Sequence, residues 1–323
     1  MAKYRVVVTR LISEAGLQLL RQQPGIKLVV CRQKNVLSPA ALKKAVKGAD
    51  AVVSLLSDKI TADVMAAAGR QLKVVANYAV GFDNIDVKAA AKRGIAVTNL
   101  PGASSQSVAE YAVALTLALG RRVLEGDHFV RQGKYKQWEP LLLLSRDFEG
   151  TTVGVVGTGR IGARYATMMH KAFNCRILYS DVVKNSALEN KTGAKKVPLA
   201  TLLKQADVVS LHVPLLPITH HLINKKSLAL MKPTALLINT ARGPIIDEQA
   251  LATALRRKTI AGAAIDVFEH EPKITPGLKR LSNIILSPHI ASSTVASRDA
   301  MAVMAAQNII AVLHGNPPLT PAR

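Results

Sequence analysis

Cysteine is scarce in this sequence. Only Cys31 and Cys175 occur among 323 residues, each at or beside a segment expected to form a strand. No cysteine or histidine stands near them at the spacing of a zinc site, so neither a disulfide framework nor a zinc cluster is indicated, and we expect two reduced structural thiols. His220 and His221 are adjacent, and their side chains should diverge on any regular element. We therefore expect no metal site.

Long apolar runs are also missing, because no stretch approaches the roughly 20 residues that a membrane-spanning helix requires. The first residues, MAKYRVVVTR, contain too short an apolar stretch for a secretory leader, and the last, PPLTPAR, carry no address signal. No GxSxG segment, which would indicate a serine nucleophile, is present. We expect a cytoplasmic protein with no membrane partner.

Acidic residues are few relative to basic ones. The chain has 21 Asp and Glu against 43 Lys and Arg, which gives a formal net charge of +22. Such a surface attracts polyanions, including nucleic acid. The excess is shared by both halves of the chain, however, and the only basic runs are pairs and triplets such as Arg256, Arg257 and Lys258. This distribution favours a generally basic surface over a dedicated nucleic-acid site.

Short apolar runs alternate with helical patterns along the first hundred residues. The runs are RVVVT, KLVVC, AVVSLL and KVVANYA, and a segment with helical spacing follows each of them. Ser13, Ser38, Thr61 and Asp86 stand where N-caps belong, and each is expected to supply an oxygen to the free amides of the following helix. This alternation is typical of a parallel sheet with helices on its faces.

A second alternation follows a long apolar helix, which is expected from about Ser104 to Arg122. Its runs are TTVGVVG, RILYSD, ADVVSLHVP, TALLINTARG, IAGAAIDVFE and NIILSPH. The final helical segment, ASSTVASRDAMAVMAAQNIIAVLHG, comes after this second sheet and is expected to fold back on the first domain. We therefore predict an α/β protein with two doubly wound parallel sheets. Residues 1–100 and 290–323 would form a smaller flavodoxin-like substrate domain, residues 101–289 an inserted Rossmann domain, with a cleft between them.

A glycine-rich turn stands at the start of the second alternation. In VGVVGTGRIG, residues 153–162, Gly157, Gly159 and Gly162 follow an apolar run and precede a helix that is expected to begin near Ile161. This context is typical of a dinucleotide-binding turn, in which the pyrophosphate faces the amino end of the helix. Asp181 closes RILYSD at the distance expected for an acid that binds the ribose hydroxyls, and its charge would repel a 2′-phosphate. The sequence therefore favours NAD over NADP.

Three further side chains follow apolar runs of the same sheet. Hydride transfer between a nicotinamide and a 2-oxo acid needs a cation for the carboxylate and a proton donor beside the carbonyl oxygen. Arg242 in NTARG can bind a carboxylate with two hydrogen bonds, His289 in SPHIASS can donate the proton, and Glu271 in DVFEHEP can pair with the imidazole. Glu269 and His270 of the same segment remain alternatives to Glu271. The carboxyl ends of parallel strands share one edge of a sheet, which is where doubly wound folds bind ligands.

Taken with these residues, the sequence resembles the D-isomer-specific 2-hydroxyacid dehydrogenases over essentially its whole length. The resemblance is carried by VGFDNID, SVAEYAV, VGVVGTGRIG, LHVPLLPITHHLIN, LINTARGPIIDE, AGAAIDVFEHEP and SPHIASST, in the order of that family. It implies the inserted nucleotide domain, and it implies that Arg242 binds the substrate carboxylate, that His289 transfers the proton and that Glu271 is its partner.

The resemblance also implies further contacts. The amides of Val80 and Gly81 would meet the substrate, and Asp266 would accept from the nicotinamide carboxamide. The remaining cofactor contacts that it implies are Val108, Arg160, Ile161, His212, Val213, Pro214, Thr219, Thr240, Ala241 and Ala291, together with Arg242 and His289.

Two functions of different classes follow as hypotheses. The first, favoured by the resemblance to glyoxylate and hydroxypyruvate reductases, is an NADH-dependent reduction of glyoxylate to glycolate or of hydroxypyruvate to D-glycerate, with the loop SLLSDKI shaping the pocket. The alternative is a nucleotide-sensing binding module or corepressor on the same fold. A homodimer formed largely by the nucleotide domains is expected. Trp138 is expected either to enter the partner's site or to anchor its own loop as a buried side chain.

Overall fold

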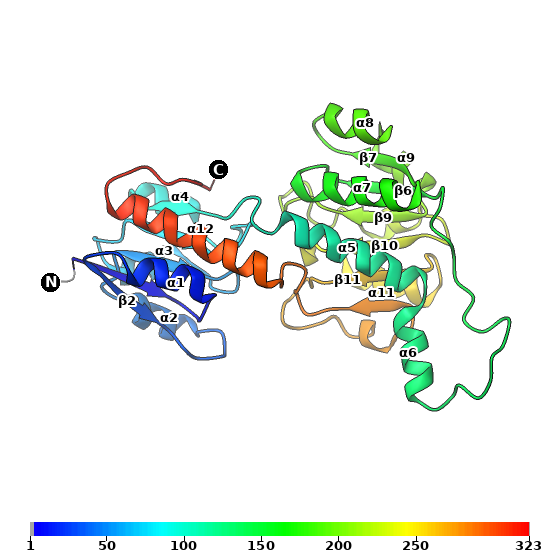
Figure 1. Cartoon of the computed structure of the whole chain (residues 1–323), viewed down its shortest axis with the longest axis horizontal. Helices are drawn as coiled ribbons and strands as arrows, with labels where there is room; N and C mark the ends of the chain where they lie inside the picture. Colours follow the sequence, from blue (N-terminus) through cyan, green and yellow to red (C-terminus); the bar gives the residue numbers. More distant parts are fainter. Residues whose placement is uncertain (1–2, 323) are drawn as a thin grey trace. The chain divides into compact units, whose positions relative to one another are not determined.

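The computed structural model describes residues 3–322 and divides into two compact units, which are shown in Figure 1. The first unit consists of Met1–Ser104 and Ser293–Arg323, and the second consists of Ser105–Ser292. The inserted unit thus begins four residues and ends three residues later than the range expected from the sequence. Among residues 3–322, no helix combines the length and the apolar character that are needed to cross a membrane.

The first unit is built on a five-stranded parallel sheet with the order β2-β1-β3-β4-β5. Its strands are β1 (Tyr4–Val8), β2 (Ile26–Val30), β3 (Ala51–Ser54), β4 (Val74–Asn77) and β5 (Ala96–Thr98). Its helices are α1 (Glu14–Arg21), α2 (Pro39–Val46), α3 (Ala62–Ala68), α4 (Val87–Lys92) and α12 (Val295–Leu313). This strand order is that of flavodoxin-like doubly wound folds.

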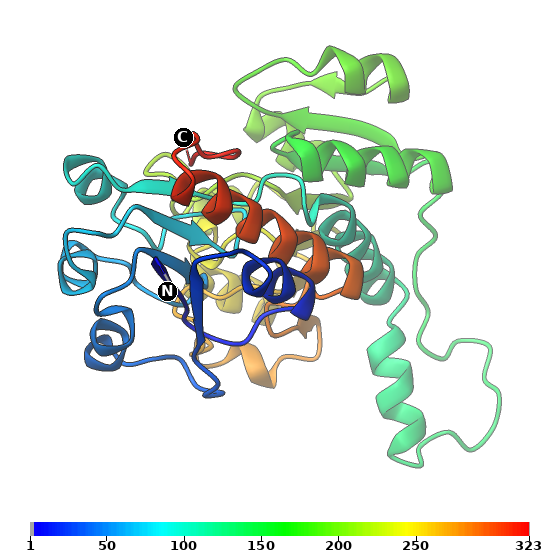
Figure 2. The ribbon, with the colours of Figure 1, turned by 60° about the vertical axis from the view of Figure 1, so that its left-hand side comes forward.

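Alternating side chains of β1 enter two different cores. Val6 and Val8 lie in the core beneath α1 and α12, whereas Val7 lies in the opposite core beneath α2, α3 and α4. Figures 1 and 2 show α12 alongside α1 on one face of the sheet. The two helices approach so closely that a Cβ atom at Gly16 would lie 2.2 Å from the carbonyl oxygen of Ala302. The last helix therefore completes the core of the first unit.

Three of the four expected N-caps form. The side chains of Ser13, Ser38 and Asp86 accept hydrogen bonds from amides in the first turns of α1, α2 and α4. Thr61 occupies the N-cap position of α3, but its side chain makes no cap hydrogen bond. The expectation for Thr61 was therefore wrong as regards the bond, because position before a helix does not fix the rotamer of the hydroxyl.

The second unit is built on a seven-stranded parallel sheet with the order β12-β11-β10-β9-β6-β7-β8. Its strands are β6 (Thr152–Val156), β7 (Arg176–Ser180), β8 (Lys195–Lys196), β9 (Val208–Leu211), β10 (Leu236–Asn239), β11 (Gly262–Ile265) and β12 (Ile284–Leu286). The order reverses between β6 and β9, which is the switch point at which Rossmann folds bind dinucleotides. The predicted fold class, two doubly wound parallel sheets with a Rossmann domain, is confirmed.

Helices cover both faces of this sheet. They are α5 (Ser105–Gly120), α6 (Val123–Arg131), α7 (Arg160–Phe173), α8 (Ser186–Thr192), α9 (Leu199–Gln205), α10 (Lys225–Leu228) and α11 (Glu248–Arg256), with short 3₁₀ turns at Gly243–Ile245 and Leu278–Arg280. Val153 and Val155 pack in the core that contains side chains of α5 and α7. Val156 packs in the opposite core with side chains of α9 and α11.

The long helix expected to run to about Arg122 ends at Gly120, and Arg122 takes a left-handed conformation with φ 55° before α6 begins. No residue of α6 is buried, and Figure 1 shows α6 and the loop after it projecting from the rest of the second unit. Seven apolar side chains of this arm, residues 123–144, are exposed. They are Val123, Leu124, Val130, Tyr135, Trp138, Leu141 and Leu144. Trp138 is 77% exposed, so its expected alternative as a buried anchor is wrong.

Candidate active site

The glycine turn after β6 has the shape that a dinucleotide requires. Gly157 has φ 88°, and a Cβ atom there would lie 2.8 Å from the carbonyl oxygen of His212. A Cβ atom at Gly162 would lie 2.0 Å from the carbonyl oxygen of Gly157, so the first and third glycines are needed for packing. Around Gly159, by contrast, no described atom lies within 4 Å of such a Cβ. Arg160 and Ile161 begin α7 directly after this open position, so the turn fits a pyrophosphate at a helix amino end.

Asp181, which follows β7, is bonded to the same turn. Its Oδ2 accepts from the amide of Thr158 at 2.6 Å and from the Thr158 hydroxyl at 3.0 Å, while its Oδ1 accepts from the amide of Val183 at 3.2 Å. Burial opposes ionisation of this carboxyl, but these hydrogen bonds outweigh it and lower the pKa of Asp181. The chain therefore holds a carboxylate beside the glycine turn.

His212 closes the turn from the side of β9. Burial lowers the pKa of His212 to about 3, so the ring is neutral near pH 7. Its Nε2 lies 2.9 Å from the hydroxyl of Ser210, and its ring is tilted against that of Tyr165. The side chain thus packs under the turn, and Val213 contacts the turn next to it. Pro214 and Thr219 form the following turn, in which the Thr219 hydroxyl donates to the Pro214 carbonyl at 2.7 Å.

His289 follows β12 in a left-handed conformation with φ 56°. Asp266, which follows β11 and is fully buried, fixes this conformation. Its carbonyl accepts from the amide of His289 at 2.8 Å, and its carboxylate accepts from the amides of Ile290 and Ala291 at 2.9 and 2.7 Å and from the hydroxyl of Ser287 at 2.7 Å. Left-handed backbone at a non-glycine residue persists only where its surroundings hold it. Asp266 therefore orients the segment that carries His289.

Glu271 pairs with His289. Its Oε2 lies 3.0 Å and its Oε1 3.2 Å from Nδ1 of the ring, and Oε1 also accepts from the amide of Phe268 at 3.0 Å. Burial opposes ionisation, but the bond and charge of His289, the Phe268 amide and the positive charge of Arg242 together lower the pKa of Glu271. The imidazole is thereby held with its Nε2 turned away from the carboxylate.

Arg242 follows β10, the strand next to β11. Its Nη1 donates to the carbonyl of Ala241 at 2.8 Å, and its own carbonyl accepts from Nδ2 of Asn239 at 2.9 Å. A Cβ atom at the next residue, Gly243, would lie 1.9 Å from the carbonyl carbon of Phe268, so the loops after β10 and β11 touch through their backbones. Arg242, Glu271 and His289 therefore follow three adjacent strands, β10, β11 and β12, and Glu271 contacts His289.

The hydroxyl of Thr240 lies at the same edge. It is buried, and its Oγ1 has no hydrogen-bond partner within the described residues 3–322. A buried hydroxyl without a partner is costly, so this atom is available to a ligand. Val108 on α5 and Ala291 after β12 are both buried apolar residues of the second unit.

Val80 and Gly81 lie in the first unit, after β4. Their carbonyls accept hydrogen bonds from Asn99 and Asn77 at 2.6 and 2.8 Å, whereas in the described part of the chain neither of their amides has an acceptor. Two neighbouring free amides suit an anion. The side-chain amides of Asn77 and Asn84 exchange hydrogen bonds. Nδ2 of Asn77 donates to Oδ1 of Asn84 at 3.0 Å, and Nδ2 of Asn84 donates to Oδ1 of Asn77 at 3.2 Å.

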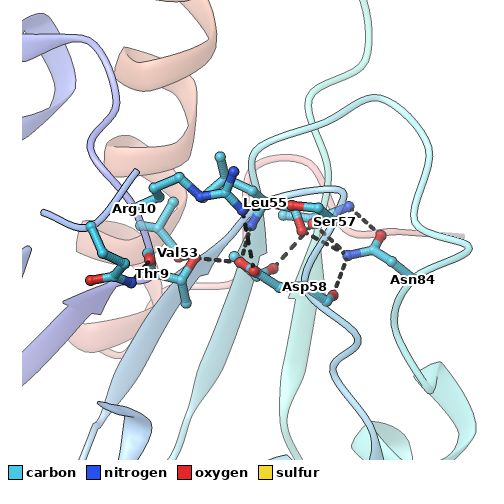
Figure 3. A network of polar contacts seen from close by, with 10 residues as sticks. Thr9, Arg10, Val53, Leu55, Ser57, Asp58 and Asn84 are labelled. Carbon is cyan, nitrogen blue, oxygen red and sulfur yellow. Dashed lines mark hydrogen bonds and ion pairs between the residues drawn. The ribbon is translucent and has the colours of Figure 1, made fainter. Parts of the chain in front are cut away.

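Figure 3 shows the network that continues from Asn84 to the loop SLLSDKI. Nδ2 of Asn84 donates to the carbonyls of Leu55 and Asp58 at 3.1 and 2.9 Å. The buried carboxylate of Asp58 accepts from the Leu55 amide at 2.9 Å and from the Thr9 hydroxyl. Sequence reasoning did not single out Asn84 and Asp58, because both lie in loops beyond the ends of β4 and β3, where no apolar pattern marks them.

Glu269 and Glu271, the two acidic residues of FEHEP, have different partners. Glu269 does not contact His289 but pairs with His221, whose Nε2 lies 2.7 Å from Oε1 of Glu269. His220 and His221 do not diverge as expected, because their rings stack with centroids 4.1 Å apart. The expectation failed because His221 lies in a turn with φ 49° rather than on a regular element.

Known proteins resemble this chain in sequence and in fold. The family model described as D-isomer specific 2-hydroxyacid dehydrogenase, NAD binding domain, matches residues 113–291. A glyoxylate reductase of Korarchaeum cryptofilum is 47% identical over 319 residues, which are 98% of this chain and 95% of that protein. A solved structure from Thermus thermophilus has a TM-score of 0.92 at 42% identity, with 99% of this chain and 100% of that chain covered.

A second solved structure is that of an NADPH-dependent glyoxylate/hydroxypyruvate reductase from Sinorhizobium meliloti in complex with NADP and malonate. It has a TM-score of 0.86 at 32% identity, with 99% of this chain and 97% of that chain covered. The alternative of a binding module without enzymatic activity is not favoured by these matches. The chain belongs to the D-isomer-specific 2-hydroxyacid dehydrogenases, oxidoreductases that use a nicotinamide dinucleotide.

Proposed function

We propose that this enzyme reduces glyoxylate to glycolate and hydroxypyruvate to D-glycerate with NADH. The observation that carries the proposal is the pairing of His289 with Glu271 at the edge of the sheet where the charge of Arg242 also acts. The names of the relatives from Korarchaeum cryptofilum and Sinorhizobium meliloti support these two substrates.

Each side chain has a role that follows from its chemistry. The planar guanidinium of Arg242 binds the substrate carboxylate with two hydrogen bonds. Nε2 of His289 donates the proton that the carbonyl oxygen acquires as it becomes a hydroxyl, while Glu271 holds the ring and stabilises its protonated form. The nicotinamide, when bound, supplies the hydride. The free amides of Val80 and Gly81 bind the substrate carboxylate as well.

The cofactor contacts are proposed from the same positions that the sequence suggested. The open turn at Gly159 accepts the pyrophosphate, and Asp181 accepts the ribose hydroxyls. The unpartnered hydroxyl of Thr240 faces a ligand group. Asp266, which already accepts three hydrogen bonds from the chain, serves mainly to hold His289, and any bond from the carboxamide adds to these three.

NADH rather than NADPH is proposed as the preferred cofactor. The support is Asp181, a carboxylate whose low pKa keeps it charged at the place where a 2′-phosphate would lie. The Sinorhizobium meliloti reductase, by contrast, is NADPH-dependent and was solved with NADP.

A homodimer formed by the second units is also proposed. The support is the arm of residues 123–144, which exposes seven apolar side chains. No residue of α6, the helix of this arm, is buried within the chain, so these side chains are free to contact a partner. Exposed apolar patches of this kind are typical of protein interfaces. Light scattering should give the mass of two chains, and Val130→Asp should shift the mass toward one chain.

A cytoplasmic location is also proposed. It is supported by the two free cysteines, because disulfides are rare in the reducing cytosol.

One experiment tests the activity. Purified protein is mixed with NADH or NADPH and with glyoxylate, hydroxypyruvate, pyruvate or a longer 2-oxo acid, and the loss of absorbance of the reduced cofactor is followed. We expect the highest kcat/KM for glyoxylate or hydroxypyruvate with NADH. A higher kcat/KM for a longer 2-oxo acid would contradict the substrate, and a higher kcat/KM with NADPH would contradict the cofactor.

A further inference from the structure

Three potential metal ligands gather on the second unit, outside the set of residues assigned to hydride transfer. His220 and His221 lie in the turn between β9 and α10, and Glu269 lies in the loop after β11. One ligand atom from each residue lies within 4.8 Å of the others. We propose that this cluster, His220, His221 and Glu269, binds a divalent transition-metal ion of the Zn²⁺ class.

The backbone of His221 brings the two imidazoles together. With φ 49° the residue is left-handed, and its amide donates to the carbonyl of Pro244 at 2.8 Å. In an extended or helical segment the two rings would point apart. Here they stack with an interplanar angle of 29°, although the side chain of His220 is exposed. A strained turn thus presents two adjacent histidines to one point.

Hydrogen bonds to neighbouring residues hold Glu269 and His221 in place. The amide of Glu269 donates to a carboxylate oxygen of Glu248 at 2.6 Å, and Oε2 of Glu269 accepts from the amide of Glu248 at 3.4 Å. The carbonyl of His221 accepts from Nδ2 of Asn224 at 2.9 Å. Groups that orient metal ligands in this way strengthen binding, because less freedom is lost when the ion arrives.

The distances suit an ion after a small movement. Nε2 of His221 and Oε1 of Glu269 are 2.7 Å apart, with room for one proton between them. A zinc ion would lie about 2.0–2.2 Å from each atom and would separate them to about 3.3 Å in a tetrahedral site. His220 is exposed and can turn to supply the third ligand, and water would occupy the fourth position.

The donor set decides the class of ion. Two imidazole nitrogens and one carboxylate suit Zn²⁺, Ni²⁺ or Cu²⁺, whereas Mg²⁺ and Ca²⁺ require oxygen ligands. The ligands belong to a pair distinct from the one assigned to catalysis, because Glu269 contacts His221 and Glu271 contacts His289. The site is therefore separate from the pair assigned to catalysis, and an ion bound there would tie the turn before α10 to the loop that carries Glu271.

The test uses full-length protein without a histidine tag, freed of metal by a chelator. Equilibrium dialysis against ZnCl₂ should give one ion per chain, and Zn²⁺ should raise the Tm. With CuCl₂, electron paramagnetic resonance should show coupling to two nitrogens. His220→Ala should weaken Zn²⁺ binding more than about tenfold and leave the metal-free Tm unchanged, since this side chain is exposed.

The matched control is His314→Asn, which changes an exposed histidine of the first unit and should bind Zn²⁺ as the wild type does. Glu269→Gln should abolish Zn²⁺ binding. This variant can also lose stability, because the carboxylate of Glu269 bonds to His221 in the metal-free protein. The test of the proposal is therefore the Zn²⁺ affinity of His220→Ala. Wild-type protein that retains no stoichiometric Zn²⁺, or His220→Ala with unchanged affinity, would overturn the proposal. Either result would leave the reductase activity untouched as a separate question.

Discussion

Nδ1 of His289 lies 3.0 Å from Oε2 of Glu271, and the two residues reach each other from the ends of adjacent parallel strands, β12 and β11. The imidazole is fixed at one nitrogen by a carboxylate that remains charged, since the pKa of Glu271 is lowered. In the proposed mechanism, the other nitrogen, Nε2, faces the substrate. This division of roles between the two ring nitrogens is what a general acid requires.

Replacing His289 tests the proton donor. His289→Asn should lower kcat by about 10²- to 10⁴-fold, the range typical of lost general acid–base catalysis, with a smaller change in KM. Glu271→Gln keeps the shape of the side chain but removes its charge, so kcat should fall by less than in His289→Asn. Steady-state kinetics with NADH and glyoxylate provide the measurement. Equal kcat values in the wild type and His289→Asn would refute the assignment.

Replacing Arg242 tests the carboxylate contact. Arg242→Lys keeps the charge but loses the two parallel hydrogen bonds, so kcat/KM should fall by about 10- to 100-fold. The free energy of unfolding in urea should be measured for the same variant, to separate a lost substrate contact from a damaged fold. Unchanged kcat/KM in a folded Arg242→Lys protein would rule out the proposed role.

Replacing Asp181 tests cofactor choice. Asp181→Ala removes the charge that opposes a 2′-phosphate, so the ratio of kcat/KM for NADPH to that for NADH should rise by about tenfold or more. Glu189→Gln is the control, because Glu189 is an acid of the neighbouring helix α8 that bonds to Tyr179 and Lys184 rather than to the glycine turn. The idea fails if both variants change the ratio equally.

Two glycines should respond to alanine with opposite signs. Gly243→Ala places a Cβ atom 1.9 Å from the Phe268 backbone, so the loop that leads to Glu271 must move, at a cost of about 1–3 kcal/mol or more in the free energy of unfolding and with a loss of kcat. Gly126→Ala lies within α6, where the nearest atom is 3.9 Å away, and should stabilise the chain by about 0.5–1 kcal/mol. Urea unfolding of both variants measures these effects.

Acid should destabilise the second unit through its paired carboxylates. The pKa values of Asp181, Asp207 and Glu271 are lowered from their ordinary values of 3.8, 3.8 and 4.5. As the pH falls, these carboxylates therefore bind protons in the unfolded chain before they do so in the folded chain. Their contribution to the free energy of unfolding is complete above about pH 5 and is lost as the pH falls through the folded pKa values. Urea unfolding at a series of pH values from 7 to 3 should show this decline.

Asp207 provides the variant for this test. Its carboxylate accepts from Lys232 at 2.8 Å and from the amide of Thr152 at 2.9 Å, and burial opposes these contacts without cancelling them. Asp207→Asn cannot titrate, so its stability should depend less on pH below 5 than that of the wild type. An identical pH dependence in the two proteins would count against the role of this pair.

The alternation of strands and helices could be predicted from the sequence. The alternation of apolar runs indicated both sheets, because strand and helix spacing are local properties. The short strands β5 and β8 were missed, the latter because Lys195 and Lys196 are exposed and carry no apolar pattern. Arg242, Glu271 and His289 could be placed together because parallel strands bring their carboxyl ends to one edge.

Contacts that depend on a single turn could not be predicted. The stacking of His220 on His221 depends on the left-handed conformation of His221, which no residue type there requires. The bonds from Asn84 to the loop at Leu55 join segments 29 residues apart, and only the folded chain shows that they meet. Likewise, the three hydrogen bonds that Asp266 accepts reveal a positioning role that its place after a strand did not specify.

The packing of Gly16 against Ala302 has a consequence for the order of folding during synthesis. The sheet of the first unit leaves the ribosome early, but one of its faces is covered only by α1 until α12, at the far end of the chain, has been made. The inserted unit, Ser105–Ser292, has all of its own strands before then. The inserted unit should thus reach its native state before the first unit does. Until α12 is made, the nascent amino-terminal sheet exposes part of its apolar surface, to which chaperones can bind.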